Sequence, residues 1–334
     1  MKLSRMFAAG MVAGGALLAV VPAHAEPSPA FAGEFPSPVG AAARVMESGQ
    51  RDALVAANQY GECLEHGSKV CVFVAGRPAI LSEPEERSRR LGGSIGALFS
   101  PLEHLVVGAS ISQDRQTSKY LEGQRNAVNA TGLRSFMVWG EVGHGPRLSG
   151  VLGWQNIDTS LRRAGEGGTA EGNTTGYSLA LSMRAAYGVE LGDHISVSPF
   201  VGFGVFNTRL NGYTESKASG LEAASFDRQH FTSTIGSAGV EVEKHFSFGR
   251  LWAEAAYAAR LSGYNTTLSG SVLGESFVQR RLAVAEPRAV ELGAGAAVPL
   301  SHGISLVGTL GASLPTAGAG RYHAFGTAAL VMGF

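Results

Sequence analysis

Long segments of this chain alternate, with a period of two, between apolar residues and small or polar residues. In the segment 177–191 the apolar positions are Tyr177, Leu179, Leu181, Met183, Ala185, Tyr187, Val189 and Leu191. The residues between them include Ser178, Ser182, Arg184 and Glu190. Successive side chains of a strand point to opposite faces of its sheet, so the alternation predicts strands with one apolar face and one polar face. No run after residue 25 is apolar enough for a membrane-spanning helix, so a membrane protein of this kind would have to be a closed barrel.

Twelve such segments follow one another, and the connections between them are short and long in turn. The strands are predicted at 69–81, 91–99, 104–117, 131–143, 147–160, 174–191, 194–210, 228–246, 249–265, 284–300, 303–315 and 321–334. The short connections are 100–103, 144–146, 192–193, 247–248 and 301–302. Outer-membrane barrels have an even strand number, short periplasmic turns and longer extracellular loops. The predicted fold is therefore all-β, a twelve-stranded antiparallel transmembrane outer-membrane β-barrel with both ends facing the periplasm.

The amino terminus has the features of a secretory signal peptide. Lys2 and Arg5 precede an apolar stretch, Met6 to Val21, and Ala23-His24-Ala25 is a small-x-small cleavage site before Glu26. A single membrane anchor, which is the alternative, would need roughly 20 firmly apolar residues. We predict a signal peptide over 1–25 that is cleaved between Ala25 and Glu26, and hence an exported protein.

Two segments lie between the signal peptide and the first strand. Residues 26–40 carry four prolines and are predicted to form an extended linker. Residues 41–64 are rich in helix formers and contain no proline, and charged residues are spread around this helix. A helix this polar needs a polar site, which the lumen of a barrel would provide. We predict a lumenal α-helix with its connector over 41–68, followed by the barrel domain over 69–334.

Composition and cysteine usage narrow the function. The 46 glycines suit closely spaced, curved strands, and a net charge of zero argues against nucleic acid as a partner. Cys63 and Cys71 are predicted to form a disulfide, because an even pair of cysteines is usually bonded in an oxidising periplasm. A zinc site, which is the alternative, would need more soft ligands than the nearby His66.

Several motifs resemble the translocator domain of autotransporters, the type V secretion proteins. They are Ala186-Tyr187-Gly188, the turn Gly192-Asp193, the run Val197 to Gly202 and the run Val290 to Gly295 before a short turn. The last segment places Leu330, Met332 and Phe334 on one face, and it resembles the signal that the barrel-assembly machinery reads in that group of proteins. The resemblance covers roughly residues 41–334. It implies that the helix before the first strand threads the lumen.

The chain also departs from that family. An autotransporter normally carries a large passenger between its signal and its helix, whereas only residues 26–40 stand in that place here. We therefore expect at most a vestigial passenger. The paired asparagines at which some members cut themselves are missing, and Asn58 is the single candidate in the helix, so we expect no self-cleavage.

Residues that could bind a metal or catalyse a reaction are scattered along the sequence. Five of the nine histidines lie beside the short turns: His104, His144, His194, His245 and His302. We interpret them as polar residues at the membrane interface. The alternative is a rim of histidines that binds a metal or senses pH. A hydrolase is the enzyme alternative, but His230 and Ser233 lie three residues apart in one strand and so point to opposite faces. We expect no catalytic residue, no metal site and no cofactor.

The remaining polar residues are predicted to line the lumen. The inward-facing charges are Arg184, Glu190, Glu241, Glu243, Glu254, Arg260 and Glu291. The charges of the helix that could meet them are Arg44, Glu47, Arg51, Asp52 and Glu62. We expect these charges to hold the helix as a plug. The alternative, an open channel tuned by rings of charge, would require the helix to lie outside the barrel.

Together these features predict an outer-membrane protein of a Gram-negative bacterium that is not an enzyme. It would insert among outer-membrane lipids with the help of the barrel-assembly machinery and periplasmic chaperones. Its function would be to export or display a short N-terminal segment, together with the surface loops, to any host or surface ligand. The alternative is a passenger-less outer-membrane channel or loop-borne adhesin that shares the barrel and exports nothing.

Overall fold

The structure is a computed structural model, and it describes the residues 37–60, 69–82, 86–102, 104–120, 123–140, 144–165, 168–219, 222–263, 265–282, 288–301, 303–316 and 322–334. The predicted signal peptide, its cleavage site at Ala25 and Glu26, and nearly all of the predicted linker lie outside this part of the chain. Glu62, Cys63, His66 and His302 also lie outside it. One helix, α1 (Pro38–Tyr60), precedes the strands.

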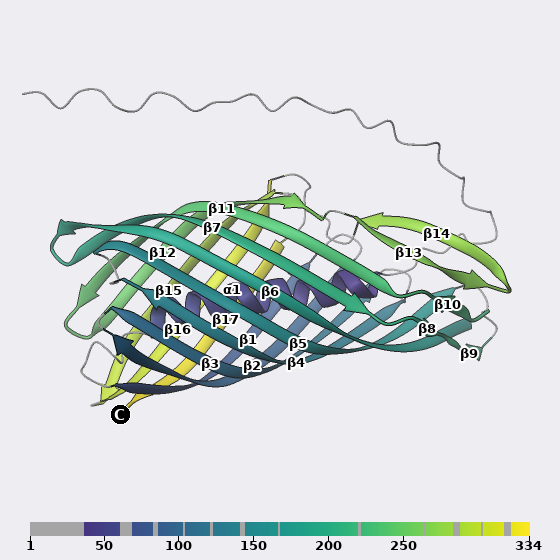
Figure 1. The fold of residues 1–334 in the computed structure, drawn as a ribbon, viewed down its shortest axis with the longest axis horizontal. Coiled ribbons are helices and arrows are strands. Elements are labelled where there is room, and N and C mark those ends of the chain that lie inside the picture. The colour runs from purple at the N-terminus through teal and green to yellow at the C-terminus, as the bar shows by residue number, and fades with distance from the viewer. Residues whose placement is uncertain are drawn as a thin grey trace, which may run out of the picture. The chain divides into compact units, whose positions relative to one another are not determined.

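Within the described residues, twelve antiparallel strands close into a ring (Figure 1). Around the ring they are β1 (Val70–Ser82), β2 (Glu86–Leu102), β3 (Leu105–Tyr120), β4 (Arg125–Trp139), β5 (Gly145–Gly165), β6 (Gly168–Gly192), β7 (Ile195–Leu210), β11 (Gln229–Phe246), β12 (Gly249–Ser262), β15 (Arg288–Ser301), β16 (Ile304–Pro315) and β17 (Tyr322–Gly333). Pairing of β17 with β1 joins the two ends of the sheet, so no barrel strand is left with an open edge. The predicted twelve-stranded barrel is confirmed.

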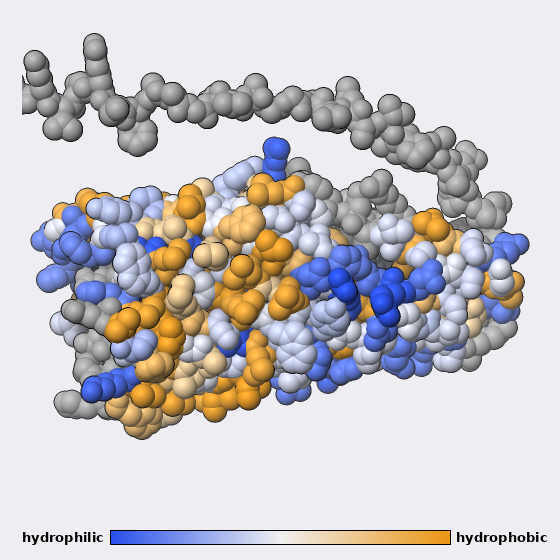
Figure 2. All heavy atoms as spheres, in the orientation of Figure 1, coloured by the Kyte–Doolittle hydropathy of each residue, from blue (hydrophilic) through white to orange (hydrophobic). Residues whose placement is uncertain are grey.

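The two faces of the barrel follow the alternation of the sequence. On β6 the side chains of Tyr177, Leu179 and Leu181 are exposed on the outer face, whereas Ser178 and Arg184 are buried on the lumenal face. Figure 2 shows apolar side chains gathered over one part of the outer surface and strongly hydrophilic side chains gathered beyond them. An apolar exterior and a polar interior are what a barrel in lipid requires. Among the described residues, no helix has the length and apolar character needed to cross a membrane.

The short turns lie together at one end of the barrel, which we call the short-turn end. Asp193 and His194 form a two-residue turn between β6 and β7, and both have positive φ, 50° and 59°, as a type I′ hairpin turn requires. The first and last strands also meet at this end. The N–H of Phe334 donates to the carbonyl of Val70 at 2.8 Å, and the carbonyl of Phe334 accepts from the N–H of Lys69 at 3.0 Å.

At the opposite, long-loop end the structure corrects two predicted loops. Segments 211–227 and 266–283, predicted as connections, contain β8 (Tyr213–Thr214), β9 (Ser216–Ser219), β10 (Ala224–Phe226), β13 (Asn265–Val272) and β14 (Glu275–Leu282). Four of these strands form a small sheet in the order β14-β13-β10-β8, while β9 pairs with β6. The Phe226 ring stacks on Tyr213 at 4.8 Å and meets Phe277 edge-on at 5.8 Å. A few aromatic residues therefore give this polar stretch a core of its own.

Three strands, β2, β3 and β4, extend farther toward the long-loop end than predicted. β2 begins at Glu86 instead of residue 91, β3 continues to Tyr120, and β4 covers Arg125–Trp139 instead of 131–143. In the extensions of β2 and β3 polar residues occupy both faces, and in that of β4 the apolar residues Val128 and Ala130 face the lumen, so the alternation of an apolar outer face and a polar lumenal face is missing there. The backbone nevertheless stays paired across the neighbouring strands, which carry the wall beyond its apolar outer surface.

Candidate functional site

Helix α1 occupies the lumen and runs from the long-loop end toward the short-turn end (Figure 1). Near its start, Arg44 contacts Glu86 at the first residue of β2, while Ala53, later in the helix, belongs to a buried cluster with Cys71 of β1. The start is well capped. The N–H of Gly40 donates to the Ser37 hydroxyl at 3.2 Å, and Pro38 takes the first helical position, where its missing N–H costs nothing.

One side of α1 packs against the wall formed by β4, β5, β6, β7 and the start of β11, which we call the apolar wall. The buried cluster between them consists of Val39, Ala41, Ala42, Ala43 and Val45 from the helix and Val128, Ala130, Ile157, Leu210 and Phe231 from the strands. Farther along, Met46 packs on Ala180 and Phe206. Because the alanines are small, the helix backbone can approach the strands closely.

The other side of α1 faces β1, β2, β12, β15, β16 and β17, which we call the charged wall. The carboxylate of Glu47 accepts hydrogen bonds from Arg260 at 2.8 and 2.9 Å, and it also accepts one from the Ser233 hydroxyl at 2.7 Å. Arg44 reaches both oxygens of Glu86 at 2.8 Å. Two further ion pairs join Arg51 with Glu291 and Asp52 with Arg90. Of the predicted lumenal charges, Arg260 and Glu291 thus contact the helix.

A cluster around Asp114 was not found from the sequence. The Asp114 carboxylate is fully buried and lies 3.3 Å from nitrogen atoms of Arg77, Arg90 and Arg134. Arg90 connects this cluster to the helix through Asp52. A side chain at Gly49 of α1 would lie about 2.5 Å from the Arg134 guanidinium, so glycine at this position lets Arg134 fit under the helix.

A second cluster spans the lumen nearer the short-turn end. Glu241 accepts from Arg147 at 2.7 Å and from Arg184 at 3.1 Å, and Arg184 also reaches Glu254 at 2.9 Å. The neighbouring Glu243 pairs with Arg250 at 3.1 Å and with His245 at 2.6 Å. Within the described residues, the predicted lumenal residues Arg184, Glu241, Glu243 and Glu254 therefore pair with strand residues and not with the helix. Arg147 and Arg250 are the partners that the sequence did not identify.

Sequence reasoning could have found these missing residues by applying the alternation to every strand. Arg77 shares a face with Cys71 and Phe73, whose lumenal orientation the alternation predicts. Asp114 likewise shares a face with the buried Ser110 and Ser112. What the sequence could not supply is the cross-strand register that brings the three arginines onto one carboxylate.

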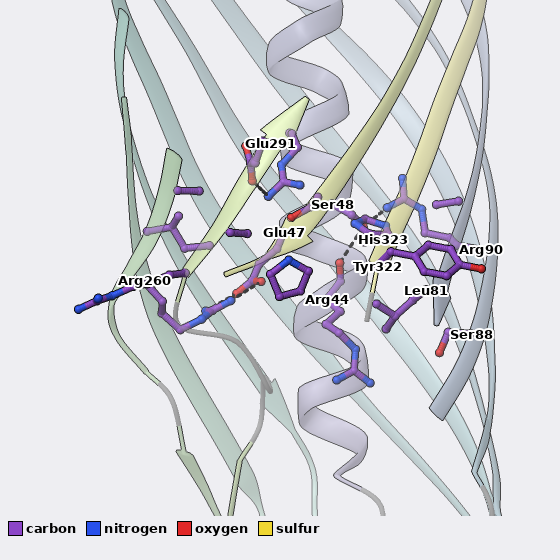
Figure 3. Close-up of a pocket in the computed structure, with 18 of the residues that line it drawn as sticks. Arg44, Glu47, Ser48, Leu81, Ser88, Arg90, Arg260, Glu291, Tyr322 and His323 are labelled. Atoms are coloured by element: carbon purple, nitrogen blue, oxygen red, sulfur yellow. Dashed lines mark hydrogen bonds and ion pairs between the residues drawn. The ribbon is translucent and has the colours of Figure 1, made fainter. Parts of the chain in front are cut away.

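Two cavities lie beside α1, one of them against the charged wall. The larger, of about 150 Å³, is lined by Arg44, Glu47, Arg51, Arg260, Glu291 and His323 among others (Figure 3). Figure 3 shows Glu47 projecting from the helix toward Arg260 across this space. The smaller cavity, of about 100 Å³, shares Glu47, Arg51 and Glu291 with the first, and residues of β6, β7, β11 and β12 line the rest of it. Ion pairs therefore cross a space that side chains do not fill.

The small sheet at the long-loop end is fixed to the barrel wall by charge. Arg163, in the extension of β5, donates to both oxygens of Glu215 at 3.2 and 2.6 Å. The pKa of the Tyr213 phenol is raised above its ordinary value by burial and by the nearby negative charge of Glu215. This sheet is therefore an ordered surface at the mouth of the barrel.

The structure also locates the other residues that the sequence analysis singled out. Cys71 is buried toward the lumen, but its predicted partner Cys63 lies outside the described residues, so the disulfide stays a prediction. Leu330 and Met332 pair with Val74 and Val72 of β1, and Phe334 is exposed. His230 is exposed and Ser233 is fully buried, which places them on opposite faces. His104, His144, His194 and His245 lie at or beside turns of the short-turn end. Asn58 lies in α1 with its side chain outside the described part, and within that part no three potential ligands cluster as a metal site.

Comparisons with known proteins agree with this geometry. Residues 82–311 match the family described as Autotransporter beta-domain. The fold is similar to the translocator domain of autotransporter NalP from Neisseria meningitidis, with a TM-score of 0.70 and 15% identity over 88% of this chain and 97% of that chain. It is also similar to the beta domain of the Bordetella autotransporter Brka, with a TM-score of 0.57 and 17% identity over 80% of this chain and 99% of that chain. No curated protein matches the chain by sequence.

Proposed function

Because the chain belongs to the Autotransporter beta-domain family, we propose that it is an outer-membrane translocator of a Gram-negative bacterium. Its activity is to carry the segment before α1 through the lumen and to present it at the cell surface. The observation that carries the proposal is the direction of α1, which starts at the long-loop end, whereas β1 starts at the short-turn end. With the short turns in the periplasm, residues before Pro38 leave the barrel on the outside.

The chemistry of the lumen suits the passage of a polypeptide. Peptide groups need hydrogen-bonding partners wherever water is excluded, and the lumenal face offers arginines, carboxylates and hydroxyls. Most of these charges are paired with one another, as in the cluster around Glu241, so the wall does not present one sign of charge to a passing chain. The helix then remains in the lumen as the final segment of the transported chain.

Delivery to the membrane completes the proposal. The segment 1–25 acts as a signal peptide cleaved between Ala25 and Glu26, and periplasmic chaperones bring the unfolded chain to the barrel-assembly machinery. That machinery reads Leu330, Met332 and Phe334. The pairing of Phe334 with Lys69 and Val70 supports this role, because the last residue takes part in closing the ring.

One observation favours a second activity in addition to export. The sheet of β8, β10, β13 and β14 has its own aromatic core and exposes Leu273 and Val278 at the barrel mouth. An ordered, partly apolar surface of this kind suits a loop-borne adhesin better than a solute channel. The location of α1 in the lumen also opposes an open channel.

The test is the location of residue 30 in intact cells. An epitope inserted there should be removed by external protease, and cysteines placed at Gly168 and Ser219 should react with an impermeant thiol reagent. A cysteine at Gly192, in a short turn, should react only after the outer membrane is permeabilised. A protected epitope in cells whose long loops label normally would reject export and leave the adhesin. Reversed labelling would reject the orientation.

A further inference from the structure

A row of basic side chains crosses the outer face of the barrel near the long-loop end. In the strand registers Arg87 of β2 is opposite Lys119 of β3, Lys119 is opposite Arg125 of β4, and Arg125 is opposite Arg162 of β5. All four side chains are exposed. We call these four residues the cationic row. At its end, Arg162 faces Glu171 of β6, with Nε 3.9 Å from the carboxylate.

Such a row is unfavourable for the barrel alone. Residues directly opposite one another on neighbouring strands have Cβ atoms about 5 Å apart, and like charges at this spacing destabilise the pair. Within the described part of the chain, Arg87, Lys119 and Arg125 form no ion pair with an acidic side chain. A bound anion would remove the repulsion along the row.

The row lies beyond the apolar outer surface on the same strands. Toward the short-turn end, the outer faces of these strands carry the exposed residues Leu91, Ile111, Leu133 and Trp154. Between these residues and the row lie two further exposed cations, Arg89 and Arg115. Figure 2 shows hydrophilic side chains beyond the apolar part of the surface.

The sector of the ring from β15 to β1 has a different outer face at its long-loop end. Arg288 is exposed there, but the exposed outer-face residues beside it on β15, β16, β17 and β1 are Val290, Leu314, Tyr322 and Ile80. The row of basic residues therefore distinguishes the β2–β5 sector from the β15–β1 sector.

We propose that the cationic row binds the phosphate groups of lipopolysaccharide in the outer leaflet. The inference rests on the proposed function, since the row meets that leaflet only when the long-loop end is outside the cell. Guanidinium groups donate two parallel hydrogen bonds to phosphate oxygens, and lysine adds a compact charge. The row extends over three strand spacings of about 4.8 Å, or about 14 Å. An array of this length fits a glycolipid with several phosphates better than a single free phosphate ion.

The test compares variants of the full chain folded in detergent. The probes are phosphorylated lipopolysaccharide, the same material after enzymatic dephosphorylation, and inorganic phosphate. The variant carries Arg87→Gln, Lys119→Gln and Arg125→Gln, and the matched control carries Arg209→Gln and Arg228→Gln, two exposed cations outside the row. Heat-modifiable migration shows that each variant is folded.

Each basic residue near an anionic surface contributes roughly fivefold in affinity, so the triple variant should bind phosphorylated lipopolysaccharide on the order of 100-fold more weakly. The control should remain within about twofold, and affinity should fall as salt screens the exposed charges. Equal affinity of the wild type and the triple variant would overturn the proposal. Equal wild-type binding of dephosphorylated material, or equal retention of inorganic phosphate, would also overturn it. Because binding is measured in detergent, failure of export in cells leaves this result unchanged.

Discussion

The two walls of the lumen hold the same helix by different physical means. On the apolar wall, small helix residues pack against Val128, Ile157 and Phe231. On the charged wall, the helix is held by ion pairs such as Glu47 with Arg260, and about 150 Å³ beside it stays empty. Apolar contact favours burial but is non-directional, whereas a bidentate ion pair requires one geometry. The apolar wall therefore stabilises the helix in the lumen by packing, and the charged wall fixes the position and rotation of the helix.

Under the proposed export, the helix segment moves along the lumen before it comes to rest, and the difference between the walls suits that movement. A stripe of alanines can slide along a smooth wall with little steric resistance, while each ion pair forms only when its partners arrive. In that proposal, the ion pairs of the charged wall end the movement of the chain at one position. Variants of each wall should separate the stabilisation of the helix by packing from the positioning of the helix by ion pairs.

The largest effect is expected from Phe231→Ala on the apolar wall. Phe231 is buried against the start of the helix, and truncation of a buried phenylalanine costs about 3–5 kcal/mol. We expect a lower free energy of unfolding in lipid vesicles and faster hydrogen exchange throughout 38–60. The control is Phe203→Ala, an exposed phenylalanine on the outer face of β7, which should leave exchange in the helix unchanged. Equal hydrogen exchange of the helix in both variants would contradict the conclusion that packing on this wall stabilises the helix.

Next comes Arg260→Gln on the charged wall, which leaves the Glu47 carboxylate with the Ser233 hydroxyl and without its guanidinium partner. Breaking a largely buried ion pair by removing one partner costs about 3 kcal/mol. Helix exchange should accelerate while the barrel strands keep their protection. The charge swap Glu47→Arg with Arg260→Glu should recover at least half of the loss in a double-mutant cycle. No recovery would mean that the pair has no positioning role.

A third and smaller effect is expected from Cys63→Ser. If the disulfide with Cys71 forms, it closes a loop of about nine residues and stabilises the helix attachment by roughly 2–3 kcal/mol on the chain-entropy model. Mass spectrometry without reduction should find the linked peptides, and the variant should keep a folded barrel with a higher conductance in planar bilayers. Free thiols in the purified protein would refute the bond, and unchanged conductance would remove its role in holding the helix.

The barrel could be predicted because the two environments of its wall determine the residue type at each position along a strand. Lipid on one side and a polar lumen on the other force alternation, so the β6 residues 177–191 identify both faces without a structure. The alternation of apolar and polar residues stops beyond the apolar outer surface, where both faces of a strand meet polar surroundings. β8, β10, β13 and β14 lie beyond it, and their pairing depends on contacts such as Tyr213 with Phe226 that join distant parts of the sequence.

The interior was harder to predict because orientation does not determine partners. Alternation places Glu241 and Glu254 in the lumen, but only the structure shows that both meet Arg184, from strands two and three positions away on the ring. Likewise, Asp114 is one acid among many in the sequence until three strands bring arginines onto it. The lumenal charges were expected to hold the helix, and several of them instead connect the strands to one another.

The smallest effect is expected from Gln50→Met, which tests whether anything besides packing joins the helix to the apolar wall. The Gln50 amide donates to the carbonyls of Val151 at 3.3 Å and Ala180 at 3.0 Å, while its own Oε1 is buried with no hydrogen-bond partner in the described part of the chain. Removing this side chain loses two donated hydrogen bonds, but it also removes a buried unsatisfied acceptor, and a methionine of similar length refills the space. Since both carbonyls belong to paired strands, the net loss should be about 1 kcal/mol or less. Exchange in 38–60 should then rise less than tenfold, with Gln113→Met on the outer face as the unaffected control. A loss above about 2 kcal/mol would show that this wall also positions the helix through directed bonds, and the contrast between the two walls would no longer hold.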